Sequence, residues 1–188
     1  MRSVVLNLAI SFDGLIEGPE GELDWLVREK TIDFGDILTE ILHDKDIIFY
    51  GRKAYEKWGN TQPEENADKK LKDAYRLMHS KTKYVFSKTM KDDGTGAIFI
   101  DSHIEEKIRE IKRQSGRNIW LYGGAKIATS FFNLNLIDEL QLAIHPIILG
   151  KGKPLFENLE HSHRLKLIEV KDYKSGIILV KYKVENHT

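Results

Sequence analysis

The sequence predicts a single α/β domain: a mainly parallel eight-stranded sheet with antiparallel C-terminal strands and four flanking helices. Up to about residue 134, short apolar runs alternate with amphipathic helical patterns, as is typical of parallel strands joined by helices. Beyond that point, three runs with strand periodicity follow one another without a helix, which predicts antiparallel strands at one side of the sheet. No linker or repeat divides the 188 residues, so the prediction is one domain over 1–188.

The elements of the first half follow from residue spacing. The β-branched, apolar run 4–11 ends at Asp13-Gly14 and is the first expected strand. Apolar residues recur at helical spacing over 34–42, which predicts the first helix. A short buried strand is expected at 46–50, and a second helical face runs from residue 67 to 78.

The second half continues the alternation. Strands are expected at 83–87 and 97–100. Ser102 and Glu105 have the spacing of a capping box, which predicts the start of the third helix. The remaining expected elements are a strand at 118–122, a helix at 125–134, and three strands around Leu142, Leu167 and Val180.

Composition excludes several classes of protein. Lys+Arg and Asp+Glu both number 29, so the net charge of zero gives no support for a nucleic-acid or membrane-surface partner. No cysteine is present to form a disulfide, a thiolate nucleophile or a Cys-ligated metal site, and His161-x-His163 lacks a third ligand at suitable spacing. No apolar run approaches the ~20 residues of a membrane helix, and the N-terminus does not resemble a signal peptide. The expectation is a cytoplasmic protein without a metal.

Three polar or glycine-containing segments follow expected strands, and each alone has an ordinary explanation as a turn or a solvated loop. These segments are Gly51-Arg52-Lys53, Ser87-Lys88-Thr89 and Gly123-Gly124-Ala125-Lys126. Open α/β sheets bind ligands beyond the carboxyl ends of their strands, and a helix N-terminus offers free N–H groups to a phosphate. Together the segments predict a groove for an elongated anionic ligand.

Two acidic residues, Asp33 and then Asp13, are candidate proton donors. Asp33 borders the apolar face of the first helix, whereas its neighbour Asp36 points away from that face and is the poorer candidate. Asp33 is either a helix cap or a general acid, and the sequence leaves both open. Asp13 is the next candidate, although Asp-Gly is also ordinary turn chemistry.

These motifs, in this order, resemble the dihydrofolate reductase fold, and within it the RibD C-terminal domain branch. The resemblance covers nearly the whole chain. It rests on the segments 11–14, 49–56, 84–89, 121–126 and 145–152.

The resemblance implies NADPH as hydride donor and a small-molecule substrate reduced at a C=N or C=O carbon. It implies that Gly51, Arg52 and Lys53 meet the cofactor phosphates and that Ser87, Lys88 and Thr89 meet the adenosine 2′-phosphate. Ala9 and Ile16 would lie near the nicotinamide. The pyrophosphate and nicotinamide side would be held by Tyr122, Gly123, Gly124, Ala125, Lys126 and Ile127, with a cis Gly123–Gly124 bond.

The substrate stays open at this stage. The resemblance allows an unassigned heterocycle or ribosylamine, the phosphoribosylaminouracil of riboflavin biosynthesis, or dihydrofolate. A non-catalytic NADP-binding regulatory protein is the alternative from another class. A homodimer is expected, because the run 177–184 is apolar in both strand phases and related reductases pair through their C-terminal strands.

Overall fold

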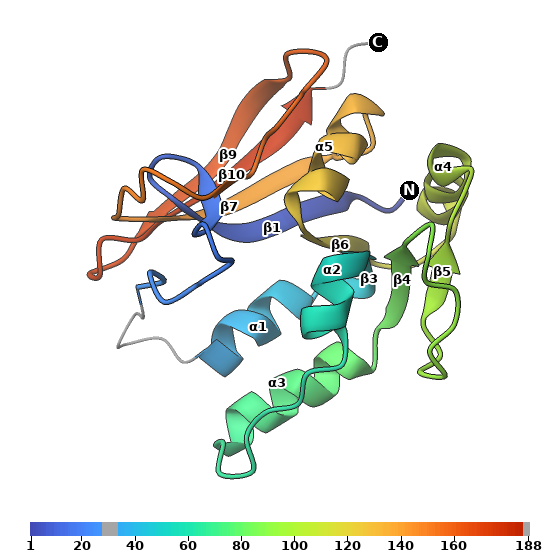
Figure 1. Cartoon of the computed structure of the whole chain (residues 1–188), viewed down its shortest axis with the longest axis horizontal. Coiled ribbons are helices and arrows are strands. Elements are labelled where there is room, and N and C mark those ends of the chain that lie inside the picture. Colours follow the sequence, from blue (N-terminus) through green and yellow to red (C-terminus); the bar gives the residue numbers. More distant parts are fainter. Residues whose placement is uncertain (28–33, 186–188) are drawn as a thin grey trace.

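The computed structural model of the chain describes residues 1–27 and 34–185, and its main feature is an eight-stranded mixed sheet (Figure 1). The strand order is β5-β4-β3-β6-β1-β7-β10-β9. In chain order the strands are β1 (Val4–Ser11), β3 (Lys45–Gly51), β4 (Thr82–Phe86), β5 (Ile98–Ile100), β6 (Asn118–Gly123), β7 (Glu139–His145), β9 (Arg164–Asp172) and β10 (Ile178–Glu185). The predicted α/β class and all eight predicted strands are confirmed.

Pairing directions also match the prediction. The strands β5, β4, β3, β6, β1 and β7 are parallel to one another, whereas β10 is antiparallel to both β7 and β9. The six parallel strands therefore end at one edge of the sheet, and the loops that follow them meet there.

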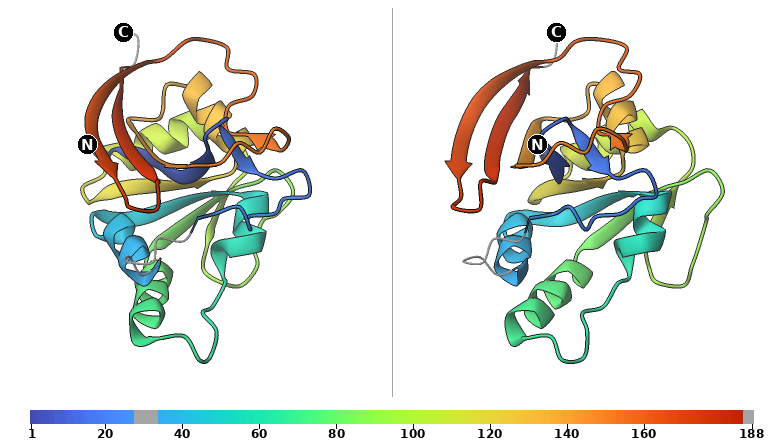
Figure 2. Two further views of the ribbon diagram at one scale, coloured as in Figure 1. Left: turned by 90° about the vertical axis from the view of Figure 1, so that its left-hand side faces the viewer. Right: turned by 60° about the vertical axis from the view of Figure 1, so that its left-hand side comes forward.

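Helices cover both faces of the sheet (Figure 2). The helices α4 (Ile104–Arg113) and α5 (Ala125–Asn133) pack on what we call the α5 face, against residues such as Leu6, Phe49 and Leu121. The helices α1 (Phe34–Leu42) and α3 (Lys69–His79) lie on the opposite, α1 face, over Ile48, Val85 and Trp120. Alternating side chains along β3, β4 and β6 supply both cores.

Two small features were not predicted. A short helix α2 (Arg52–Ala54) continues into a π-helix η1 (Tyr55–Gly59) directly after β3. A two-stranded sheet joins β2 (Leu15–Glu17) to β8 (Lys153–Pro154). Both features are too short to contain a repeating pattern of apolar residues, so the sequence did not predict them.

The helix α1 buries less of its apolar surface than expected. Gly35, Leu38 and Leu42 are buried, whereas the Phe34 side chain is 59% exposed and Ile37 is 38% exposed. The apolar stripe of this helix is thus wider than its contact with the rest of the fold.

The predicted capping box of α4 is wrong. His103, with a left-handed φ of 52°, is the N-cap residue, and it makes no side-chain cap. The Ser102 hydroxyl donates to Asp101 (2.8 Å), and Glu105 pairs with Arg109 (2.8 Å). Within residues 1–27 and 34–185, no helix is long and apolar enough to cross a membrane.

Candidate functional site

The three segments singled out in the sequence follow three adjacent strands, β4, β3 and β6. Gly51 pairs with Phe86, and Tyr50 pairs with Gly123, so these strands end side by side. We call residues 51–53, 87–89 and 122–127 the rim. The structure thus brings together the rim segments expected to bind an anionic ligand.

At one end of the rim, a Gly-Gly turn leads into α5. Gly123 has a φ of +106°, which favours glycine, and the Gly123–Gly124 peptide bond is trans, so the expected cis bond is wrong. The positive φ at Gly123 turns the chain from strand to helix without a cis bond. A Cβ at Gly124 would meet no atom within 4 Å, so the backbone there faces open space.

The N-terminus of α5 is suited to an anion. Gly124 provides no side-chain cap, and the first turn contains no acidic residue. Ala128 is the first residue of the helix whose N–H reaches a preceding helix carbonyl, that of Gly124. The N–H groups of the first turn and the helix dipole therefore favour a phosphate beside Gly124.

Gly51 allows the end of β3 to lie close to α5. A Cβ on Gly51 would lie 3.3 Å from Ile127 Cγ2 and 3.5 Å from the Gly123 carbonyl. The absence of a side chain therefore keeps the segment carrying Arg52 next to the α5 N-terminus.

The cations of the rim are solvent-accessible. Arg52 donates from one guanidinium nitrogen to both Glu56 oxygens, at 2.7 and 2.9 Å, and each of the two side chains is about 40% exposed. Lys53, Lys88 and Lys126 are exposed. Because the remaining Arg52 N–H groups carry no bond among the described residues, the guanidinium can meet a phosphate while it contacts Glu56.

Ser87 shapes the third segment of the rim. Its buried hydroxyl accepts from the N–H of Met90 at 2.9 Å and of Thr89 at 3.3 Å, which closes a turn. Lys88 and Thr89 are exposed in that turn. Ser87 keeps its own O–H as a donor, while Lys88 and Thr89 are the accessible groups.

Tyr55 positions this third segment, and sequence reasoning missed it. Its hydroxyl donates to Asp93 (2.7 Å) and bonds to Thr95 (2.7 Å), and so connects η1 to the loop that follows Thr89. Its ring packs on Tyr50, which in turn packs on Tyr122 of the rim. No periodic signal relates Tyr55 to a loop 38 residues away.

The residues expected near the nicotinamide, Ala9 and Ile16, lie near the C-terminal end of β1 and on the short strand β2. Ala9 alternates with Leu8 and Ile10 and so points to the α1 face, whereas Ile16 packs against the core of the α5 face. The Ser11 hydroxyl accepts from the Leu15 N–H (2.9 Å), which joins the two strands. The strand β1 is the neighbour of β6, so the end of β1 lies next to the Gly-Gly turn that follows β6.

Asp13 connects two loops. Its carboxylate accepts from the Ser11 hydroxyl (2.6 Å) and from the N–H groups of Leu149 (3.1 Å) and Gly150 (2.8 Å). These donors, Ser11 first, lower the pKa of Asp13 to about 2. An ionised acceptor at neutral pH is a poor proton donor, so the geometry favours a loop-joining role. Asp33, the first candidate acid, lies outside the described residues.

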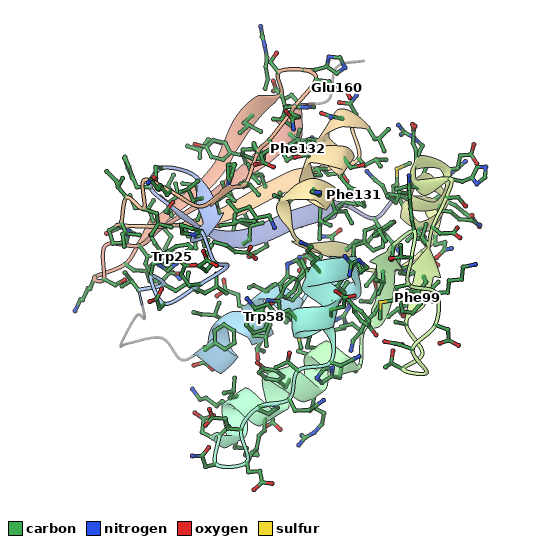
Figure 3. The ribbon with its side chains drawn as sticks, in the orientation of Figure 1. Trp25, Trp58, Phe99, Phe131, Phe132 and Glu160 are labelled. Atoms are coloured by element: carbon green, nitrogen blue, oxygen red, sulfur yellow. The ribbon has the colours of Figure 1, made fainter. Side chains whose placement is uncertain are left out.

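His145, at the end of β7, holds the segment that ends at Val27. Its Nδ1 accepts from the Val27 N–H (3.0 Å), and its ring meets Trp25 edge-on at 5.6 Å. Figure 3 labels Trp25, which lies on the segment after β2 and lines one pocket with residues 149–151 of the segment after β7. Burial lowers the pKa of His145, which favours the neutral ring that this bond requires.

Known proteins resemble the chain over nearly its whole length. The family model described as the RibD C-terminal domain matches residues 2–179. The Bacillus subtilis (strain 168) protein YyaP, named as uncharacterized, is 41% identical over 181 residues, which cover 96% of this chain and 94% of YyaP.

Two solved structures share the fold. A putative riboflavin biosynthesis protein from Shewanella sp. PV-4 aligns with a TM-score of 0.78 at 22% identity, over 98% of this chain and all of that protein. A pyrimidine reductase-like protein from Corynebacterium diphtheriae aligns with a TM-score of 0.66 at 15% identity, over 99% of this chain and 93% of that protein.

Proposed function

The chain belongs to the RibD C-terminal domain family, and we propose that it is a reductase that uses NADPH. The observation that carries the proposal is the rim: an open helix N-terminus, an arginine and a serine turn follow three adjacent strands. This arrangement fits an elongated cofactor with phosphates at more than one position. We assign the substrate to the class of small heterocycles or ribosylamines that carry a reducible C=N or C=O.

NADPH, when bound, supplies the hydride. The chain's own residues would do the rest. The N–H groups of the first turn of α5 would bind the pyrophosphate, and Arg52 with Lys53 would neutralise phosphate charge. Ser87, Lys88 and Thr89 would hold the 2′-phosphate. Ala9 and Ile16 would flank the nicotinamide. Asp33 or water would deliver the proton to the reduced substrate.

The first prediction is a preference for NADPH over NADH that depends on Arg52. Replacing Arg52 by Ala should weaken NADPH binding by about 1–3 kcal/mol, the scale of a charge-assisted hydrogen bond, and NADH binding much less. Isothermal titration calorimetry of both cofactors measures this.

Arg76→Ala is the matched control, because Arg76 is an exposed helical arginine paired with Asp73 and lies on α3, away from the rim. Equal affinities of the unmodified protein for NADPH and NADH would contradict the proposal. Binding of NADPH without oxidation across a panel of heterocyclic substrates would favour the non-catalytic alternative.

A further inference from the structure

Half of the α1 face has no helical cover among the described residues. The hydrophobic cluster under α1 and α3 takes its buried strand residues from β3, β4 and β6, with Phe99 of β5 packed against it, and none from β1, β7, β9 or β10. On this uncovered part, Asn7, Gln141, Lys181 and Glu169 are successive cross-strand partners, so they form one polar row across four strands.

The row begins with a pair of amides. Asn7 Nδ2 donates to Gln141 Oε1 at 2.8 Å, and both side chains are partly buried. Among the described residues, nothing bonds to the other two polar atoms, Asn7 Oδ1 and Gln141 Nε2. If both amides were turned over, the pair would still present one acceptor and one donor side by side. The pair therefore offers a fixed two-point hydrogen-bonding pattern.

A shelf of small side chains separates this pair from the strand ends. Ala9 and Ala143 form the next pair on the same face, about 7 Å toward the carboxyl ends, at a rise of ~3.3–3.4 Å per residue. Methyl side chains there leave the sheet open to a flat ring. Beyond the shelf, the partners Ser11 and His145 close the two strands.

We propose that Asn7 and Gln141 are specificity-determining residues that bind the lactam edge of a flat heterocyclic substrate. The ring's C=O would accept from one amide N–H, and its adjacent N–H would donate to the other amide oxygen. Bound in this way, the ring would lie over Ala9 and Ala143, toward the nicotinamide side of the proposed cofactor site. This inference rests on the proposed function for what happens to the ring, but the binding it describes does not need the cofactor.

The neighbouring ion pair limits which ligands fit. Lys181 Nζ lies 2.8 Å from Glu169 Oε2, so the next position along the row is already charge-balanced. A neutral ring edge fits the amide pair without an unpaired charge, whereas a carboxylate would meet the amide acceptor unfavourably.

The test uses 2-pyridone, the simplest flat lactam, and saturation-transfer NMR with and without NADPH. N-methyl-2-pyridone, which lacks the N–H, is the matched probe. We expect 2-pyridone to bind and its N-methyl analogue to bind at least about tenfold more weakly. Asn7→Leu and Gln141→Leu should each weaken 2-pyridone by a similar factor, whereas Glu139→Gln, one pair along β7 on the same face, should not. Melting curves establish that each variant is folded.

A change of specificity completes the test. In Asn7→Asp, Gln141 donates to the new carboxylate, and the pair presents two acceptors. This variant should lose 2-pyridone and gain protonated 2-aminopyridine, whose ring edge has two donors, and a purely structural amide pair would not produce that exchange.

Equal binding of both pyridones, no binding of either, or unchanged binding in both leucine variants would overturn the inference. The cofactor titrations decide the reductase proposal separately. Lactam binding that depends on Asn7 without any NADPH binding would keep this inference and reject that proposal.

Discussion

At the scale of single residues, the Arg52–Glu56 ion pair affects how strongly the rim can bind an anion. The Arg52 guanidinium is held by Glu56 one helical turn away, in a geometry that keeps the side chain at the rim and also offsets its charge. An exposed pair of this kind contributes little to stability, about 0–1 kcal/mol. Its main effect in this position is on the affinity of the rim for an anion.

Glu56→Gln should therefore tighten NADPH binding and leave stability nearly unchanged. The substitution removes a negative charge beside the proposed phosphate site, and the expected gain is about 2- to 10-fold at low salt, shrinking as salt is raised. Calorimetry at two ionic strengths measures it. Weaker binding in Glu56→Gln would mean that Glu56 orients Arg52 productively.

Substitution with asparagine distinguishes the roles of the two candidate acids, Asp33 and Asp13. Asp33→Asn should lower turnover of any substrate found by about 10²-fold or more if Asp33 is the general acid, with little change in NADPH affinity. If Asp33 only caps α1, asparagine serves nearly as well and activity survives. NADPH oxidation followed by absorbance distinguishes the two.

Asp13→Asn is the companion variant. It should keep turnover and lower the melting temperature, because the carboxylate joins the loops after β1 and β7. The folded pKa of Asp13, about 2, lies below the ordinary value of 3.8, so its stabilisation is complete above that ordinary value and is lost as pH falls toward 2. The difference in melting temperature between the unmodified protein and Asp13→Asn should therefore shrink as pH falls from 3.8 toward 2.

At the scale of secondary-structure elements, the spacing of apolar residues predicted the long and regular strands and helices. The eight strands and the helices α1, α3, α4 and α5 were expected because each contains several apolar residues at one spacing. The segment 52–59 contains no such repeat. Its π-helical turn depends on a local close contact, since a Cβ on Gly59 would lie 2.2 Å from the ring of Tyr55, the first residue of the same turn.

The site was predictable to the extent that it lies at strand ends. The three rim segments could be found because glycine, serine and cations interrupt apolar runs at the points where parallel strands end. The amide pair could not be found in this way, because Asn7 and Gln141 are 134 positions apart and meet only through the register of β1 with β7. His145 and Val27 likewise meet through the fold alone.

The segment that carries Trp25 and Val27 should respond to pH through His145. Val27 donates to His145 Nδ1, so protonation of that nitrogen removes the acceptor. Burial lowers the folded pKa of His145 below the ordinary 6.5, so its contribution to stability is present above about 6.5 and is lost as pH falls below that value. The fluorescence of Trp25, which touches the ring, should change over this range.

His145→Asn supplies the matched control, since its amide oxygen can accept near the position of Nδ1 and does not titrate. That variant should lose the pH-dependent fluorescence change. Trp25→Phe identifies the part of the signal that belongs to Trp58 and Trp120. A pH response that persists in His145→Asn would assign that response to a group other than His145.

At the scale of the whole molecule, the helices cover the sheet unevenly. Strands β3, β4 and β6 are enclosed by helices on both faces, whereas β9 ends the sheet with all nine of its residues exposed. Leu167, Ile168 and Val170 are each more than half exposed on that strand. A long edge strand with exposed apolar side chains favours pairing with another chain.

We therefore predict that the protein is a homodimer formed through β9 and β10. Ile168→Lys should convert it to a monomer, because a charge would have to be buried at the centre of the exposed strand. Ile98→Lys is the control, since Ile98 is a comparably exposed isoleucine on β5, the opposite edge of the sheet. Light scattering after size exclusion at tens of micromolar protein should give twice the chain mass for the unmodified protein and for Ile98→Lys, and the single mass for Ile168→Lys. A single mass for the unmodified protein would mean that the charged residues of β9 (Lys166, Glu169 and Lys171 among them) keep this edge in water.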